Sequence, residues 1–176
     1  MSGPNSRVIA VVTLAFALVW SGCRRRPSPS SISTPTTDAG AEAGFPVQVL
    51  DDLGRTVSVP SSPRRILCLL PSFTETLFAL GAGDRVVGVD DFSDYPEPAQ
   101  HLPKLGGLYD TQVERALSLK PDLILVSEGS AVVSSLSRGG AAVWAGSARK
   151  FEDVYRVIEL TGELVGRRRE AALLVT

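Results

Sequence analysis

Histidine and cysteine are scarce in this sequence, which has one His and two Cys among 176 residues. A tetrahedral zinc site built only of nitrogen and sulfur ligands needs four such side chains, so structural zinc is nearly excluded. No charge of one sign predominates, because 18 Lys and Arg stand against 19 Asp and Glu, and aromatic residues make up only 6%. Without a positive field or an aromatic surface for stacking on bases, nucleic acid is not indicated as a partner.

The motifs of common enzymes and of nucleotide-binding loops are also absent. The sequence has no Gly-x-Ser-x-Gly elbow, no Gly-x-Gly-x-x-Gly and no Walker A loop, so nothing indicates nucleotide chemistry. A serine nucleophile needs a neighbouring base, and the single histidine, His101, falls in an expected loop. Ser72 could act as a nucleophile after a strand, but Ser72 and Glu75 have the spacing of a capping box, which favours a helix cap. We expect a protein that is not an enzyme.

The first 22 residues have the pattern of a secretory signal. Arg7 precedes a thirteen-residue run, Val8 to Trp20, that is apolar except for one Thr, and two small residues then stand before Cys23. The run reaches only roughly 20 Å as a helix, short of the roughly 30 Å hydrocarbon core of a membrane. Small residues before a cysteine are similar to the bacterial lipobox, so we expect a lipoprotein-type signal peptide at 1–22 and lipidation of Cys23. An anchor helix and an ordinary cleavable signal remain the alternatives.

A spacer is expected after the lipidated cysteine. Ten of the twelve residues from Pro27 to Asp38 are Pro, Ser or Thr, a composition that cannot bury a core. We therefore assign residues 23–44 to a tether that holds one ordinary domain at the extracytoplasmic face of the membrane. The second cysteine, Cys68, lies in an apolar run and is expected to be a buried thiol without a disulfide.

The remaining sequence predicts an α/β fold. Valines alternate with other residues on both sides of the turn at 51–54, which indicates a β-hairpin. Continuous apolar runs then suit strands that are covered on both faces, as in a parallel sheet; they lie at 66–70, 86–89, 123–126 and 142–145. Helical segments alternate with these strands; they are expected at 73–80, where Gly81 ends the helix, at 111–119, where Thr111 and Glu114 form a second capping box, and at 131–137.

The C-terminal segment predicts one long helix. Apolar residues follow helical spacing from Phe151 to Val165, and only two glycines weaken the pattern. A helix that continued to the last residue would be roughly 38 Å long, more than one small lobe needs for cover, so we expect it to reach a second body. Its far half should expose an apolar stripe; the stripe consists of Leu164, Leu173, Leu174 and Val175.

The longest expected loop, residues 90–110, follows the carboxyl end of a predicted strand, where open α/β sheets place ligands. It carries Phe92, Tyr95, Leu108 and Tyr109, and three prolines stiffen it. A stiff aromatic loop binds large, partly apolar ligands at low entropic cost. The same side chains could instead cover the edge of the sheet. The residue types leave both interpretations open.

An acidic cluster of Asp90, Asp91 and Asp94 opens this loop. Three carboxylates could ligate a hard cation. Aspartates in loops more commonly accept hydrogen bonds from the backbone of a turn. We therefore predict no metal site.

Three strings of residues, 65–75, 88–96 and 113–124, resemble in order and spacing the N-terminal lobe of the class III periplasmic binding proteins, which have a helical backbone between two lobes and serve ABC importers of vitamin B12, ferric siderophores or haem. The resemblance covers roughly 45–174. It implies a three-layer α/β lobe with a mostly parallel sheet and an opening hairpin. It also implies a receptor that needs no cofactor, captures cobalamin or a ferric chelate, and delivers it to a membrane permease.

The resemblance also implies roles for individual residues. The ligand would contact Pro71, Ser72, Phe92, Tyr95, Leu108 and Tyr109. Glu114 falls where the family has a surface glutamate that docks onto the permease. Phe92 stands where the cobalamin receptor has a tyrosine and Leu108 where it has a tryptophan. Because leucine offers no stacking face, this departure favours a siderophore or another chelate over cobalamin. The related zinc and manganese receptors need several histidines, which argues against that branch.

The resemblance places the lobe at 45–149 and the start of the helix between the lobes at 150–176. The family has a second lobe after that helix, and this sequence stops within it. We therefore expect a truncated form with half of a cleft and weak ligand binding, because a pocket normally buries roughly 70–90% of its ligand. A lipid-tethered surface module that binds a protein partner, without a role in transport, is the alternative. A hydrolytic or acyl-transfer enzyme that uses Ser72 is a third interpretation.

Overall fold

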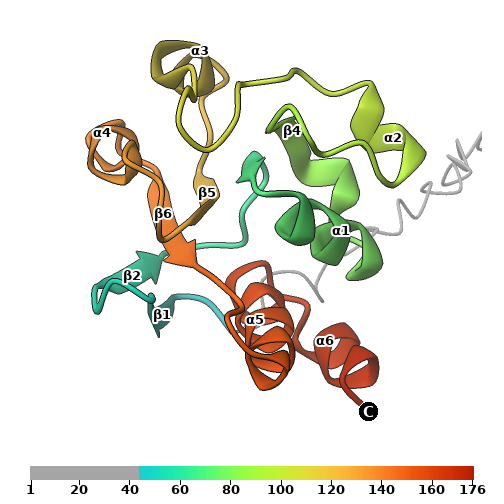
Figure 1. Ribbon diagram of the computed structural model, residues 1–176. Coiled ribbons are helices and arrows are strands. Elements are labelled where there is room, and N and C mark those ends of the chain that lie inside the picture. The colour runs from blue at the N-terminus through green and yellow to red at the C-terminus, as the bar shows by residue number, and fades with distance from the viewer. Residues whose placement is uncertain (1–43) are drawn as a thin grey trace, which may run out of the picture. The chain divides into compact units, whose positions relative to one another are not determined.

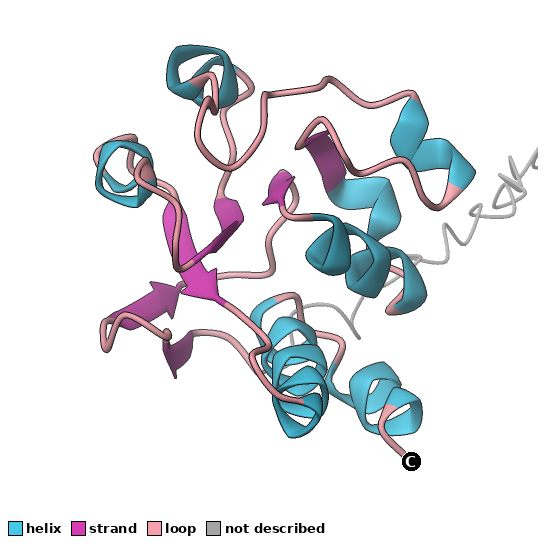
Figure 2. Cartoon of the chain, viewed as in Figure 1, coloured by secondary structure: helices cyan, strands magenta, loops and turns pink. Residues whose placement is uncertain are grey.

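The computed structural model describes residues 44–176. The predicted signal peptide, the lipidated cysteine and nearly all of the tether lie outside the described residues. Within 44–176 the chain forms a hairpin and a parallel sheet with helices on both faces (Figures 1 and 2). No helix of this part is long and apolar enough to span a membrane.

The predicted hairpin is confirmed. Strands β1 (Val47–Leu50) and β2 (Thr56–Val59) pair antiparallel and bury their alternating valines on one side. Asp51 shapes the turn, because its Oδ1 accepts hydrogen bonds from the backbone N–H of Leu53 (3.1 Å) and of Arg55 (2.7 Å).

The parallel sheet is also confirmed. Its four strands are β3 (Ile66–Leu69), β4 (Val86–Val89), β5 (Leu123–Ser127) and β6 (Ala142–Gly146), in the order β4-β3-β5-β6. Every neighbouring pair is parallel. Nearly all strand side chains are buried, as continuous apolar runs require when helices cover both faces of a sheet.

Helices cover both faces of this sheet. They are α1 (Pro71–Ala79), the short α2 (Glu97–Gln100), α3 (Val113–Ser118) and α4 (Val133–Ser137), with a 3₁₀ turn at Gly83–Arg85. The chain moves from β3 first to one side and then to the other, so right-handed connections place α1 on one face and α3 and α4 on the opposite face. Two separate apolar cores result. One contains α1 and the hairpin, and the other contains α3 and α4.

The last residues of α1, α3 and α4 lie within one position of the prediction, but their first residues differ by two, and both predicted capping boxes are wrong. Pro71 takes the first position of α1, so Ser72 lies inside the helix, is exposed and caps nothing. Proline is preorganised for this position because its φ is already fixed near the helical value. Helix α3 begins after Gln112 without a side-chain cap, and the hydroxyl of Thr111 donates instead to the carbonyl oxygen of Gly107 (2.7 Å).

The prediction of one continuous C-terminal helix is wrong. Helix α5 (Phe151–Leu164) ends at a turn in which Gly166 has a φ of 71°, and α6 (Arg168–Leu174) packs back against α5. Gly162 permits this close approach, since a Cβ atom there would lie 2.4 Å from the Cβ of Ala171. Leu164 is consequently buried rather than exposed, whereas Leu173 and Leu174 are exposed as predicted.

Replacing Gly162 with valine is expected to detach α6 from α5. The added side chain would overlap Ala171, and overpacking of this kind costs about 1–3 kcal/mol. Hydrogen exchange should show lost protection of the α6 amides while the sheet stays protected. Ala172→Val, on the exposed face of α6, serves as the control and should leave this protection unchanged. Equal protection in the two variants would contradict the packing described.

Candidate functional site

The carboxyl ends of all four parallel strands meet at one edge of the sheet. Pro71 and Ser72 follow β3, the loop of residues 90–110 follows β4, Glu128 follows β5, and the segment around Arg149 follows β6. The direction of the connections reverses beside β3, and open α/β sheets bind ligands at such a point. This edge is therefore the candidate site.

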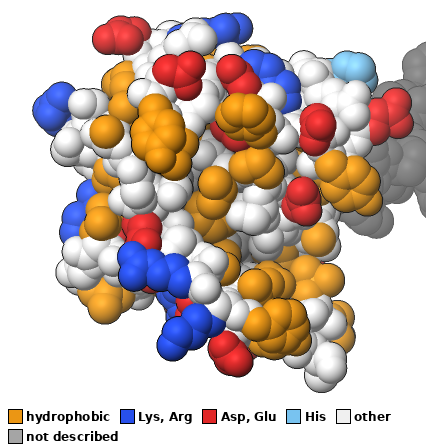
Figure 3. Space-filling view, in the orientation of Figure 1, with side chains coloured by type: hydrophobic (Ala, Val, Ile, Leu, Met, Phe, Trp, Pro, Cys, Tyr) orange, Lys and Arg blue, Asp and Glu red, His pale blue; other side chains and the backbone are white. Residues whose placement is uncertain are grey.

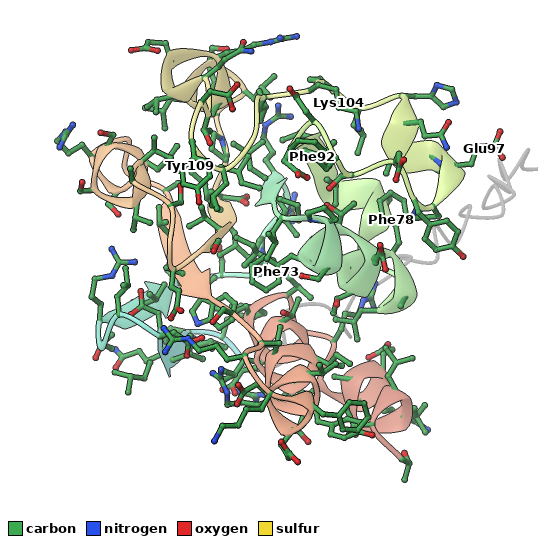
Figure 4. All side chains as sticks on the ribbon, in the orientation of Figure 1. Phe73, Phe78, Phe92, Glu97, Lys104 and Tyr109 are labelled. Carbon is green, nitrogen blue, oxygen red and sulfur yellow. The ribbon has the colours of Figure 1, made fainter. Side chains whose placement is uncertain are left out.

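The aromatic side chains of the loop point into solvent. Phe92 is 70% exposed, Tyr95 67% and Tyr109 86%, while Leu108 is half-buried. Figure 3 shows apolar side chains standing among acidic ones on this face, and Figure 4 shows where Phe92 and Tyr109 lie. Because these three side chains are mostly exposed, they contribute little cover to the sheet edge.

Hydrogen bonds join the beginning of the loop to residues 103–106 near its end. Val89 at the end of β4 donates its N–H to Pro103 (3.0 Å) and accepts the N–H of Leu105 (2.9 Å). Asp91 Oδ1 accepts the N–H of Gly106 (3.0 Å). Leu105 is fully buried beneath the loop. The exposed aromatic residues thus stand on a braced support.

Two carboxylates of the acidic cluster hold the backbone and side chains of the loop. Asp90 is 4% exposed and accepts hydrogen bonds from the hydroxyl of Ser93 and from the N–H of Phe92 (3.3 Å). Asp91 holds the second half of the loop, because its Oδ1 accepts the N–H of Gly106. Among residues 44–176 no group of three or more His, Cys, Asp or Glu side chains is placed to hold a metal ion.

Two buried groups beside the site have shifted pKa values. Burial raises the pKa of Asp90 above its ordinary 3.8, against the opposing effects of the hydrogen bonds from Ser93 and Phe92 and of the positive charge of Lys104. Burial also raises the pKa of the Cys68 thiol far above its ordinary range. This thiol is fully buried and unpaired, as the sequence predicted, and is inert as a nucleophile.

The raised pKa of Asp90 predicts a pH-dependent stability difference between the protein and an Asp90→Asn variant. A carboxyl whose pKa is raised in the folded state stabilises the protein below its unfolded pKa and loses that contribution as the pH rises through the folded pKa. The free energy of unfolding of the wild type minus that of the variant should therefore fall as the pH rises above about 3.8. Urea denaturation at a series of pH values measures this difference. A difference that grew with pH would show that the hydrogen bonds to the carboxylate outweigh its burial.

A charged group that the sequence analysis missed lies at the β6 end of the same edge. Arg149 bonds the carboxylate of Glu128, and Arg156 bonds both oxygens of Asp52 (2.9 and 3.1 Å). Asp153 accepts the N–H groups of Lys150 (3.0 Å) and Arg149 (2.9 Å), which lower its pKa. The side chains of this group, apart from Lys150, line a cavity of about 230 Å³. No pattern in the sequence joined them, because their partners lie up to 104 positions apart.

The other predicted residues occupy different surroundings. Pro71 and Ser72 stand at the edge, and no hydrogen bond of the Ser72 hydroxyl is found within the described chain. His101 is exposed at the end of α2, and no hydrogen bond between it and Ser72 is found among residues 44–176. Glu114 is exposed at the second position of α3 and makes no capping bond.

The arrangement is that of one α/β lobe with exposed aromatic side chains on the loop at the carboxyl edge of its sheet. Residues 66–176 match the model of the periplasmic binding protein family. The match covers well over half of the chain, and the chain therefore belongs to this family.

Similar proteins agree with this assignment. An uncharacterised ABC transporter substrate-binding lipoprotein of Bacillus subtilis, YvrC, is 36% identical over 137 residues, which are 74% of this chain and 43% of that protein. A vitamin B12-binding protein of Yersinia pestis is 48% identical over 65 residues, 37% of this chain and 23% of that protein. The crystal structure of the heme binding protein HmuT superposes with a TM-score of 0.65 at 26% identity over 74% of this chain and 44% of that one. The chain spans less than half the length of each.

Proposed function

We propose that this chain is the extracytoplasmic solute-binding component of an ABC importer and binds a large, partly apolar chelate at the carboxyl edge of its sheet. The observation that carries the proposal is the exposure of Phe92, Tyr95 and Tyr109 on a braced loop at that edge. Exposed aromatic side chains on a rigid support bind flat or bulky ligands without a large loss of conformational entropy. The family consists of solute-binding proteins, which supports a role without catalysis.

The proposed ligands are cobalamin and iron chelates, either haem or a ferric siderophore. The names of the relatives and structural neighbours, a vitamin B12-binding protein and a heme binding protein, support both classes. Leu108 is half-buried and offers no stacking surface, which favours an iron chelate. Pro71 and Ser72 would contribute the part of the site that follows β3, and Leu108 and Tyr109 the far part of the loop.

The remaining proposals concern the membrane anchor of the protein and its docking to a permease. A relative described as a lipoprotein supports lipidation of Cys23 and an extracytoplasmic location. The exposed carboxylate of Glu114 is available for docking onto basic residues of a permease. We assign 45–149 to the lobe. We also assign 150–176, which contains α5 and α6, to the start of the segment between the lobes.

Ligand titration tests the proposed function. The chain has two tryptophans, so Trp20→Phe leaves Trp144 as the only one, and cyanocobalamin, haemin and ferrichrome are added while its fluorescence is followed. At least one should quench saturably with a Kd on the order of micromolar or weaker, because a half-cleft leaves much of the ligand in water. Free tryptophan at equal absorbance corrects for absorption of light by the ligand. Saturable binding of none of the three would refute the proposal, and sub-micromolar binding by the monomer would refute the half-cleft interpretation.

A protein-interaction module remains a second candidate because of one further observation. Phe151 (70% exposed) and Tyr155 (41% exposed) form an exposed aromatic pair at the start of α5, with Val154 beside them. Such a patch suits a protein partner. Loss of chelate binding in loop variants, with no effect of Phe151→Ala, would favour the receptor. Unchanged chelate binding in the loop variants, together with loss of binding to a protein partner in Phe151→Ala, would favour the module.

A further inference from the structure

We propose that the buried hydroxyl groups of Thr74 and Ser93 position the ligand-facing ring of Phe92 by fastening the loop to helix α1. This inference rests on the proposed function, since it concerns how that binding edge is held in shape. Thr74 is fully buried on α1 and Ser93 is 1% exposed in the loop. Their hydroxyl oxygens lie 2.9 Å apart.

The direction of the hydrogen bonds in this cluster follows from counting protons. When Asp90 is ionised its carboxylate can only accept, so the hydroxyl of Ser93 then donates its single proton to Asp90. The oxygen of Ser93 then accepts, and the hydroxyl of Thr74 must be the donor between the two. Its other contacts are the carbonyl oxygen of Leu70, which is distant at 3.4 Å, and the buried thiol of Cys68. The chain Thr74 to Ser93 to Asp90 is therefore fully satisfied, which a buried polar group requires.

The same cluster holds the backbone on both sides of Phe92. The N–H of Asp90 donates to the carbonyl oxygen of Cys68 in β3 (3.0 Å). The ammonium group of Lys104 donates to the carbonyl oxygen of Ser93 (2.5 Å). The N–H of Phe92 itself donates to Asp90 Oδ2 (3.3 Å). Phe92 thus lies in a short segment whose two ends, Asp90 and Ser93, are both held by hydrogen bonds.

The ring of Phe92 depends on this backbone because little packing holds it. It is 70% exposed. The ring lies against Gly107, where an added Cβ would be 3.1 Å from its Cε2 atom. The backbone dihedral angles of Phe92 set the direction of its Cα–Cβ bond and hence which side-chain rotamers place the ring against Gly107. Holding those angles before the ligand arrives lowers the ordering cost of binding.

Thr74→Val is the informative variant. Valine has nearly the shape of threonine, so the helix keeps its packing, but the hydroxyl that reaches Ser93 is lost and a buried acceptor is left unpaired. Thr74→Ser restores a hydroxyl and should restore the behaviour of the wild type. Thr76→Val is the matched control, because the Thr76 hydroxyl bonds only a carbonyl oxygen of its own helix, that of Ser72 (2.7 Å). Ser93→Ala removes the same link from the loop side.

Hydrogen exchange of the full-length chain without ligand is the first measurement. Thr74→Val and Ser93→Ala should speed exchange of the amides at 91–95 about tenfold, as the loss of roughly 1.4 kcal/mol implies. Thr74→Ser and Thr76→Val should exchange like the wild type in this segment. Unchanged exchange at 91–95 in Thr74→Val would overturn the proposal. Equal acceleration throughout the sheet would also overturn it, because it would show general destabilisation instead of a local clamp.

Binding of haemin and of cyanocobalamin is the second measurement. Whichever probe binds the wild type should bind Thr74→Val several-fold more weakly and Thr74→Ser with the affinity of the wild type. Undiminished affinity in Thr74→Val would refute the positioning of Phe92 even if the loop were loosened. Failure of these two probes and of ferrichrome to bind the wild type would refute the proposed function instead, and the exchange measurement alone would then decide whether the two hydroxyls fasten the loop.

Discussion

Phe73→Ala is expected to lower the free energy of unfolding by about 3–5 kcal/mol, the usual cost of removing a buried phenylalanine. Phe73 is 1% exposed on α1, and its ring meets that of Trp144 on β6 edge to face, with centroids 5.4 Å apart. The alanine would leave a cavity between α1 and the sheet that well-packed neighbours cannot fill. Urea denaturation followed by the fluorescence of Trp144 measures the loss.

Phe151→Ala provides a matched control for this prediction. Phe151 also forms an edge-to-face pair at 5.4 Å, with Tyr155, but it is 70% exposed. Because its burial is slight, its removal should cost less than about 1 kcal/mol. Equal losses in the two variants would contradict the assignment of Phe73 to the core.

Phe92→Ala is expected to weaken binding of the chelate about 10- to 100-fold. Aromatic anchors in a binding site commonly contribute about 2 kcal/mol or more, and the exposed ring of Phe92 offers its apolar area to a ligand. The stability of the protein should barely change, because the ring buries little in the free lobe. The fluorescence titration compares the two affinities.

Phe92→Tyr separates the ring from the rest of the residue. A tyrosine preserves the aromatic face, so its affinity should stay within a few-fold of the wild type. If Phe92→Ala bound as tightly as the wild type, the ligand would have to contact another part of the edge.

The sequence predicted the framework of the fold because burial on two faces leaves a clear pattern. The run from Ile66 to Leu69 is apolar at every position and forms β3. The first residues of helices were less predictable. Both Pro71 and Ser72 suited the start of α1, and the helix begins at Pro71. The C-terminal helix was predicted too long, because the effect of two glycines depends on whether a second helix packs against them.

Only part of the candidate site could be predicted, because several of its features depend on contacts that form when the chain folds. The aromatic residues of the loop could be located from length and composition alone, but their exposure is a property of the folded chain. The link between Thr74 and Ser93 joins residues nineteen positions apart and carries no motif. No sequence motif indicates the pair of Arg149 and Glu128 either, because it depends on β5 and β6 lying side by side.

Hydrogen exchange with and without a bound chelate tests most directly the claim that the edge beyond the carboxyl ends of the strands binds the solute. Addition of the tightest-binding probe should slow exchange at 91–95 and 106–110 and at the start of α1, with little change elsewhere. The segments 58–63 and 121–122, at the opposite edge of the sheet, serve as the internal reference. Protection confined to that opposite edge, with none in the aromatic loop, would contradict the claim.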